Sequence, residues 1–305
     1  MTAASRKLGV LGGLSRSSTI GCHDMINREI LNLTDNRYAA DLVMWSFDPD
    51  TIVHLLSENG WSSIAPRIEE AISNLLCEGI DGLMIASDTL HCALEREAIH
   101  CGVPVIQLRD VLADEIRRLS LTKIGFVGTS VTMRSPYYRD FIQGSHGIDI
   151  VLPSESLWIN IDYSICNRIY DGEGTMLEAE TYTQILSDFE AQNVDGIVVA
   201  SPEIALAFNK PKPVPVLHTA KLHAAAAARW CVADRDIVQP TLPLYDAMRP
   251  APAESRVEAS DAPSRIALKM PYSDTFPYSR KGKGNGKGKA AASAPTSVGK
   301  QSPRS

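Results

Sequence analysis

The sequence predicts an α/β protein of two pseudo-symmetric lobes, each a parallel sheet flanked by helices, followed by a disordered C-terminal tail. Short apolar segments of strand type alternate with segments of helical periodicity. The pattern that begins at Lys7 restarts at Lys123, where Lys-Ile-Gly-Phe-Val-Gly echoes Lys-Leu-Gly-Val-Leu-Gly. The chain closes on a stretch rich in Pro, Ser, Ala, Gly and Lys, a composition that cannot bury a core.

The first half reads as strands and helices in alternation. A strand over residues 8–11 leads into a helix from about 17 to 33, whose apolar residues lie near one face. The other expected elements are strands over 41–47, 83–86 and 103–106 and helices over 64–77, 93–100 and 109–119.

A Gly12-Gly13 turn separates the first strand from its helix. Amide groups at such a turn and helix start can hold an anion. The spacing matches neither G-x-x-x-x-G-K nor G-x-G-x-x-G, so a nucleotide site is not expected. A tight turn with no ligand explains the two glycines equally well.

The second half repeats this order. Strands are expected over 123–128, 148–152, 196–200 and 214–217, with a helix around 182–189 and an alanine-rich helix over 219–232. We expect residues 1–114 to form the first lobe, completed by 214–235. Residues 115–213 form the second lobe, and 240–305 form the disordered basic tail.

Charge divides the body from the tail. Of the 30 basic residues, seven follow Asp274, and the remaining 23 face all 36 acidic residues, a net charge of −13 for the body. An acidic body argues against nucleic-acid binding by the folded part. The tail is expected to be solvated; weak contact with RNA, another anionic partner or a membrane surface is the alternative.

The six cysteines include no CxxC pair and form no metal-ligand pattern with a histidine. No apolar run is long enough to span a bilayer, and the N-terminus lacks the apolar segment of a signal peptide. A reduced compartment, and hence a cytoplasmic location, is the simplest interpretation.

Two matched strand ends are the candidate site. Ser87 follows the apolar run over 83–86, and Ser201 follows the run over 197–200; both runs end in Ala-Ser. Parallel-sheet lobes bind small molecules at the carboxyl ends of their strands. We therefore expect the two serines to face each other across one cleft.

Several motifs occur in the same order as in the cofactor-independent aspartate/glutamate racemase family, which the chain resembles over roughly residues 7–232. Its Gly12-Gly13-Leu14-Ser15 is similar to the family's opening Gly-Gly segment. Ser87-Asp88-Thr89-Leu90-His91 lies where the family carries Cys-Asn-Thr-x-His. Ser201-Pro202-Glu203-Ile204 lies where the family carries Cys-Thr-Glu-Ile, and Gly128-Thr129 resembles the start of the second lobe.

The resemblance implies an amino-acid racemase that uses neither a metal nor pyridoxal phosphate. Such an enzyme removes the α-proton from one face and returns it on the other, which needs acid/base groups on both sides of one carbon. Ser87 and Ser201 take these two positions. The resemblance also implies a small amino-acid or carboxylate ligand and a homodimer, and the predicted substrate contacts are Ser15, Asp88, Thr89, Thr129 and Glu203.

The sequence departs from the family at the centre of these motifs. Serine replaces both thiols, and a hydroxyl is a poor base unless another group takes its proton. Asp88 replaces an amide donor with a negative charge, and Pro202 removes a hydroxyl and an N–H. A catalytically degenerate small-carboxylate-binding or regulatory protein is therefore the alternative.

Two histidines are candidate supporting groups. His91 could activate Ser87, and His218 could act as a base near the second lobe; a lyase or hydrolase that uses such a Ser–His pair is a third hypothesis. A helix cap or a satisfied core position explains either histidine equally well. Cys92, the thiol next to His91, is expected to point away from the cleft.

Overall fold

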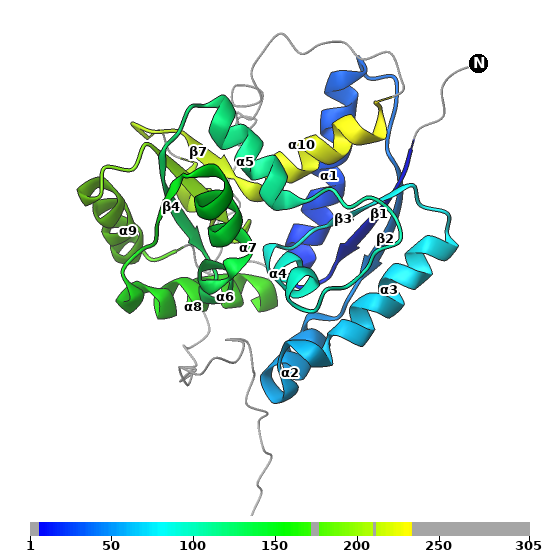
Figure 1. Cartoon of the computed structure of the whole chain (residues 1–305), viewed down its shortest axis with the longest axis horizontal. Helices are drawn as coiled ribbons and strands as arrows, with labels where there is room; N and C mark the ends of the chain where they lie inside the picture. Colours follow the sequence, from blue (N-terminus) through cyan, green and yellow to red (C-terminus); the bar gives the residue numbers. More distant parts are fainter. Residues whose placement is uncertain (1–5, 172–176, 210–211, 234–305) are drawn as a thin grey trace, which may run out of the picture.

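The computed structural model describes residues 6–171, 177–209 and 212–233, which form two α/β lobes side by side (Figure 1). The predicted basic tail, 240–305, lies outside the described residues. Both sheets are parallel throughout, as the alternation of strands and helices predicted. The first has the order β2 (Asp41–Ser46), β1 (Lys7–Gly12), β3 (Gly82–Ile85), and the second β5 (Asp149–Val151), β4 (Lys123–Gly128), β6 (Gly196–Ala200), β7 (Val216–His218).

Helices cover both faces of the first sheet. Side chains alternate along β1, so Leu8 and Val10 pack on one face with α1 (Arg16–Leu33) and α10 (Thr219–Cys231). Leu11 points to the other face, into the core that contains α3 (Ala65–Cys77). Because both faces are buried, the strand is a continuous apolar run rather than an alternating one.

The second sheet is covered by α8 (Glu155–Asp171) and α9 (Ala179–Ala191), with α9 on the outer side of the molecule (Figure 1). Ile185 and Phe189 of α9 are buried against it. The Phe189 ring lies so close to Gly125 of β4 that a Cβ at this position would be 2.7 Å from it. Glycine is therefore needed at Gly125 for the helix to reach the sheet.

The duplication extends to one polar detail. The Lys7 amide donates to Asp81 Oδ2 at 2.7 Å, and the Asp81 amide donates back to the Lys7 carbonyl at 2.8 Å. Asp195 repeats this in the second lobe, accepting from the Thr122 amide at 2.8 Å and the Lys123 amide at 3.1 Å. Each aspartate thus ties the start of the strand that carries a candidate serine to the start of its neighbour.

Several elements differ from the sequence-based expectation. The strand expected over 103–106 is a single bridge, between Leu83 and Val105. The helix expected over 93–100 is α4 (Asp88–Arg96), which starts earlier because Ser87 caps it. Elements that were not predicted are α2 (Pro49–Asn59), the 3₁₀ helices Trp61–Ser63 and Ala205–Phe208, α6 (Ser130–Arg134), α7 (Pro136–Tyr138), the π-helix Arg139–Ser145 and α8.

The last strand and the last helix belong to different lobes. The expected boundary placed 214–235 with the first lobe, whereas β7 pairs with β6 in the second sheet. α10 follows β7 directly and packs against α1 of the first lobe. The chain therefore crosses between the lobes at His218–Thr219.

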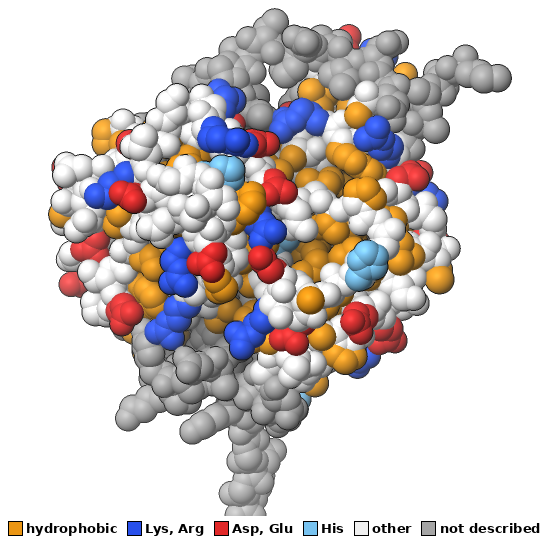
Figure 2. Space-filling view, viewed as in Figure 1, with side chains coloured by type: hydrophobic (Ala, Val, Ile, Leu, Met, Phe, Trp, Pro, Cys, Tyr) orange, Lys and Arg blue, Asp and Glu red, His pale blue; other side chains and the backbone are white. Residues whose placement is uncertain are grey.

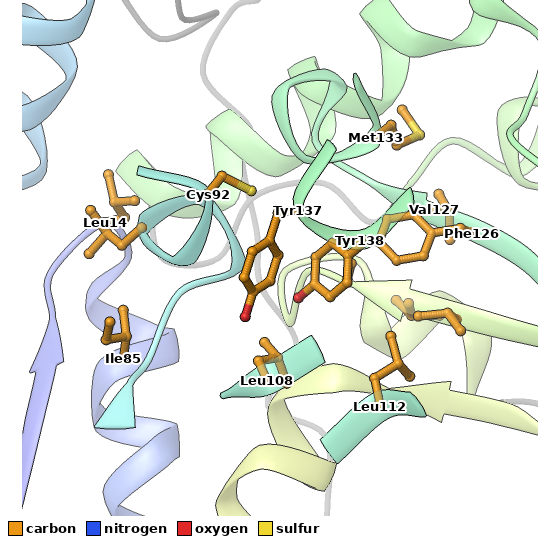
Figure 3. Packing of buried hydrophobic residues seen from close by; sticks show 14 of the residues in the cluster. Leu14, Ile85, Cys92, Leu108, Leu112, Phe126, Val127, Met133, Tyr137 and Tyr138 are labelled. Atoms are coloured by element: carbon orange, nitrogen blue, oxygen red, sulfur yellow. The ribbon is translucent and has the colours of Figure 1, made fainter. Parts of the chain in front are cut away.

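One hydrophobic core runs through both lobes. Figure 3 shows Leu14 and Ile85 of the first lobe on one side and Tyr138 of the second lobe on the other, with Tyr137 and with Leu108 of α5 (Leu108–Arg118) between them. On the face seen in Figure 2, Lys and Arg side chains lie next to Asp and Glu rather than in a basic field. In the described part of the chain, no helix has the length and apolar character needed to cross a bilayer.

Candidate active site

A cleft between the lobes brings the predicted catalytic and substrate-contact residues together. It holds about 650 Å³ of empty space, its open mouth included. Ser87 lies on the wall of the first lobe and Ser201 on the wall of the second, as their positions at matched strand ends predicted. The other predicted contacts that line the cleft are Ser15, Asp88, Thr89, Thr129 and Glu203.

Three of these side chains cap helices that start at the cleft. Ser15 accepts from the Ser18 amide at 3.2 Å at the start of α1, and Ser87 accepts from the Leu90 amide at 3.3 Å at the start of α4. Thr129 caps the short helix α6 in the same way. The N-termini of α1 and α4 contribute partial positive charge to this part of the cleft, where Asp88 and Glu203 also lie.

The Gly12-Gly13 turn holds the backbone in place. Gly13 has a φ of 112°, and a Cβ there would lie 2.1 Å from the backbone nitrogen of Phe47. The Gly13 amide donates to Thr19 Oγ1 at 2.9 Å, so it is used inside the protein. The turn therefore serves as a tight junction between β1 and α1.

Ser201 has a carboxylate partner. Its hydroxyl donates to Glu203 Oε2 at 2.6 Å, and both side chains are buried. This hydrogen bond joins Ser201 and Glu203 only, without an aromatic ring or a thiol. Glu203 is therefore placed to receive the Ser201 proton, which is the condition for a serine to act as a base.

Ser87 differs from its counterpart in the other lobe. Its Oγ accepts from the Leu90 amide, and among the described residues no carboxylate is hydrogen-bonded to it. Ser87 is half-buried, whereas Ser201 is buried. The two strand ends are equivalent in the fold and unequal in their acid–base surroundings.

Asp88 is bonded to the second lobe and to α10. Tyr138 donates its hydroxyl to Asp88 Oδ1, and Thr219 Oγ1 donates to Oδ2 at 3.2 Å. Burial raises the pKa of Asp88 to about 6, with a smaller contribution in the same direction from Glu203, and the two hydroxyls oppose this shift. Both oxygens are therefore already paired within the protein, whereas the sequence indicated a substrate contact whose negative charge opposes an anion.

The threonines form a link across the cleft. Thr129 Oγ1 lies 2.9 Å from Thr132 Oγ1, which lies 3.5 Å from Thr89 Oγ1. Thr132 was not predicted as a site residue, nor were Tyr138 and Thr219. All three lie far from Asp88 or Thr89 in the sequence, and no local pattern indicates that they meet.

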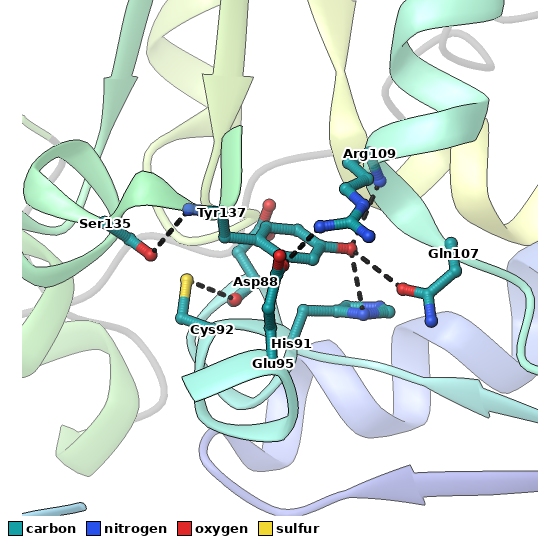
Figure 4. Close-up of polar contacts among 8 residues, drawn as sticks. All are labelled: Asp88, His91, Cys92, Glu95, Gln107, Arg109, Ser135 and Tyr137. Atoms are coloured by element: carbon teal, nitrogen blue, oxygen red, sulfur yellow. Dashed lines mark hydrogen bonds and ion pairs between the residues drawn. The ribbon is translucent and has the colours of Figure 1, made fainter. Parts of the chain in front are cut away.

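His91 is not placed to activate Ser87. It is buried, its Nδ1 lies 3.2 Å from the Tyr137 hydroxyl, and its backbone amide donates to the Ser87 carbonyl (Figure 4). Tyr137 also donates to Gln107 Oε1 at 3.3 Å. Burial is the main reason why the pKa of His91 lies well below its usual value, so it is a neutral structural group.

His218 lies just before α10 and does not line the cleft. Burial, with a contribution from Lys221, lowers its pKa to about 4. In the described part of the chain neither the His91 ring nor the His218 ring is hydrogen-bonded to the hydroxyl of a candidate serine, so a catalytic Ser–His pair is not formed. His223, which does line the cleft, uses its Nε2 proton to donate to the Ile106 carbonyl at 2.6 Å.

No cysteine takes the place of the missing thiols. Cys92 points away from the cleft, with its Sγ 3.3 Å from the Asp88 carbonyl (Figure 4). Cys22 lines the cleft, but burial raises its pKa to about 12, as it does for Cys92. Among the described residues, no group of three or more His, Cys, Asp and Glu side chains is placed to hold a metal ion.

Comparison with known proteins gives a consistent result. A sequence model of the Asp/Glu/Hydantoin racemase family matches residues 11–227. A candidate Asp/Glu racemase from Yersinia pestis has 28% identity and a TM-score of 0.67, over 74% of this chain and 99% of its own. The aspartate racemase of Picrophilus torridus (20% identity, TM-score 0.60, 79% and 99% covered) shares the fold. So does a glutamate racemase from Francisella tularensis in complex with D-glutamate (16% identity, TM-score 0.52, 75% and 82% covered).

Proposed function

This chain belongs to the Asp/Glu/Hydantoin racemase family, and from that premise we propose that it racemises a small amino acid without a cofactor, using Ser87 and Ser201 on opposite walls of the cleft. The observation that carries the proposal is the 2.6 Å hydrogen bond from Ser201 to Glu203. It supplies the proton acceptor that a serine needs in the position of a thiol.

The proposed reaction moves one proton at each wall. Ser201 Oγ takes the α-proton from the substrate while its own proton passes to Glu203. Ser87 then donates its hydroxyl proton to the opposite face of Cα, which inverts the centre. Glu203 returns its proton to solvent and Ser87 regains one through the open mouth, so the protein ends as it began.

Substrate binding follows from the charges around the two serines. The N-termini of α1 and α4 suit the substrate α-carboxylate. Glu203 and Asp88 suit its ammonium group, since both are carboxylates that line the same cleft. Thr89 and Thr129 add hydroxyl donors on either side.

The proposal is tested by proton exchange in heavy water. We expect the protein to replace the Cα proton of its substrate with deuterium, followed by NMR. Glu203→Gln keeps a hydrogen-bond acceptor next to Ser201 but cannot take a proton, so the rate should fall by about 10²-fold or more. Glu70→Gln, on the exposed surface of α3, is the matched control and should leave the rate unchanged.

Two results would contradict the proposal. Absence of exchange with every amino acid tried would refute racemisation, and an unchanged rate in Glu203→Gln would remove the Ser201–Glu203 pair from the mechanism. The homodimer and the cytoplasmic location that the sequence indicated stay predictions, to be checked by light scattering and by cell fractionation.

A further inference from the structure

The cleft has an apolar part next to the polar strand ends. α1 contributes Cys22 and Met25, and β3 contributes Met84. Cys22 Sγ lies 3.8 Å from Met84 Sδ, and both side chains are almost fully buried beneath the cleft, whereas Met25 is partly exposed to it. The apolar side chains that line the cleft include Leu14, Cys22, Met25, Met84, Leu108 and Ile165.

Cationic side chains are missing from the described lining. Neither Lys nor Arg is among the residues that line the cleft in the described part of the chain, whereas Asp88 and Glu203 are. Among the described lining residues, a second carboxylate on a substrate would meet no positive side chain. It would also lie near two buried carboxylates, and a buried unpaired charge is strongly disfavoured.

In the described lining, the apolar part also offers no free hydrogen-bond donor for a second carboxylate. The hydroxyls that line the cleft, those of Ser15, Ser87 and Thr129 among them, lie at the strand ends and helix starts. His223 is the imidazole in the lining, and its Nε2 proton is already donated to the Ile106 carbonyl. One carboxylate can therefore be satisfied at the helix N-termini, and a second one cannot be satisfied among Met25, Met84 and Cys22.

We infer that the cleft selects amino acids with one carboxylate and an uncharged, apolar side chain, such as methionine or norleucine, over aspartate and glutamate. This inference rests on the proposed function for its reaction, but it concerns recognition and can be measured separately. The α-carboxylate lies at the helix starts, the ammonium group near Glu203, and the side chain against Met25 and Met84. Flexible thioethers adapt to apolar side chains of different shapes.

The test compares L-methionine and L-norleucine with L-aspartate and L-glutamate on the full-length protein. Binding is measured by isothermal titration calorimetry, and Cα exchange in heavy water by NMR. We expect the apolar amino acids to bind and exchange better by about tenfold or more, since a substrate charge without a partner is rejected more strongly than a missing methylene. Equal or better binding of aspartate or glutamate would overturn the inference.

The two readouts separate the inference from the proposed function. Selective binding of methionine without exchange upholds the inference and refutes racemisation. Exchange that is confined to aspartate or glutamate supports racemisation and overturns the inference. Failure of all four amino acids to bind also overturns the inference.

A pair of variants tests the apolar part directly. Met25 is half-buried on α1, so a longer polar side chain can be accommodated there. Met25→Lys adds the missing cation and should shift the ratio of glutamate to methionine binding by about tenfold toward glutamate. Met25→Gln adds no charge, so it should weaken the binding of methionine without strengthening the binding of glutamate. An equal gain in glutamate binding in both variants would contradict the charge argument.

Discussion

At the scale of single residues, Asp88 combines burial with a role between the lobes. Its pKa of about 6 in the folded protein lies above its ordinary value of 3.8. Between these pH values the folded state binds more protons than the unfolded state, so its stability falls as pH rises. The contribution of Asp88 to stability is fully present below about pH 4 and is lost as pH rises through about 6.

We therefore expect Asp88→Asn to stabilise the protein at pH 7.5. The amide removes the buried charge, Oδ1 can still accept from Tyr138, and Nδ2 can donate to Thr219, whose hydroxyl is also 3.3 Å from the Val199 carbonyl. The gain in the free energy of unfolding should be on the order of 1–3 kcal/mol at pH 7.5 and should vanish near pH 4. Urea unfolding at a series of pH values measures it.

Asp195→Asn is the control, for which the stability change at pH 7.5 should have the opposite sign. Hydrogen bonds from Thr122 and Lys123 outweigh the partial burial of Asp195 and hold its pKa below the ordinary value. Its contribution is present above about pH 4 and is lost as pH falls through the folded pKa, so this variant should be destabilised at pH 7.5 and less so in acid. If both variants changed stability with the same sign and the same pH dependence, the opposite pKa shifts assigned to Asp88 and Asp195 would be refuted.

The long-range contacts of Asp88 could not be predicted from the sequence, whereas Ser201 and Glu203 are only two positions apart and belong to one motif. Asp88 meets Tyr138 and Thr219, which are 50 and 131 positions away. Nothing local to Asp88 distinguishes a carboxylate held by two hydroxyls from one that faces a ligand.

At the scale of elements, the start of a helix and the position of a candidate acid/base group coincide at Ser87. Ser87→Ala removes the hydroxyl that accepts from the Leu90 amide, so we expect a loss of about 1 kcal/mol in the free energy of unfolding. Ser87→Thr keeps the cap and should lose much less. Urea unfolding at neutral pH compares them, and equal losses in the two variants would show that capping is not the cause.

Long periodic elements were predictable and short ones were not. Residues 16–33 and 65–77 form helices close to the ranges that their apolar spacing indicated. α6, α7 and the π-helix that follows span only a few residues each, too few for a period to be visible. They carry Thr132, Tyr137 and Tyr138, so most of the contacts missed at the site lie on elements missed in the fold; Thr219, at the start of the predicted helix α10, is the exception.

At the scale of the whole molecule, the shared core predicts that the lobes unfold together. Leu11 and Ile85 of the first lobe belong to the same buried cluster as Phe126 and Phe189 of the second. We expect one cooperative transition, reported identically by single-tryptophan variants that retain Trp45 in β2 or Trp158 in α8. Two transitions at different urea concentrations would show that the lobes are energetically separate.

The crossing of the chain at the end of β7 has a mechanical consequence. The lobes are joined twice, through α5 and again where β7 passes into α10. Because the two lobes are connected at two points, the relative motion that distorts the chain least is a rotation about the line through both connections. Thr219 lies at one of these connections and is bonded to Asp88, so that junction serves as a pivot rather than as part of the opening.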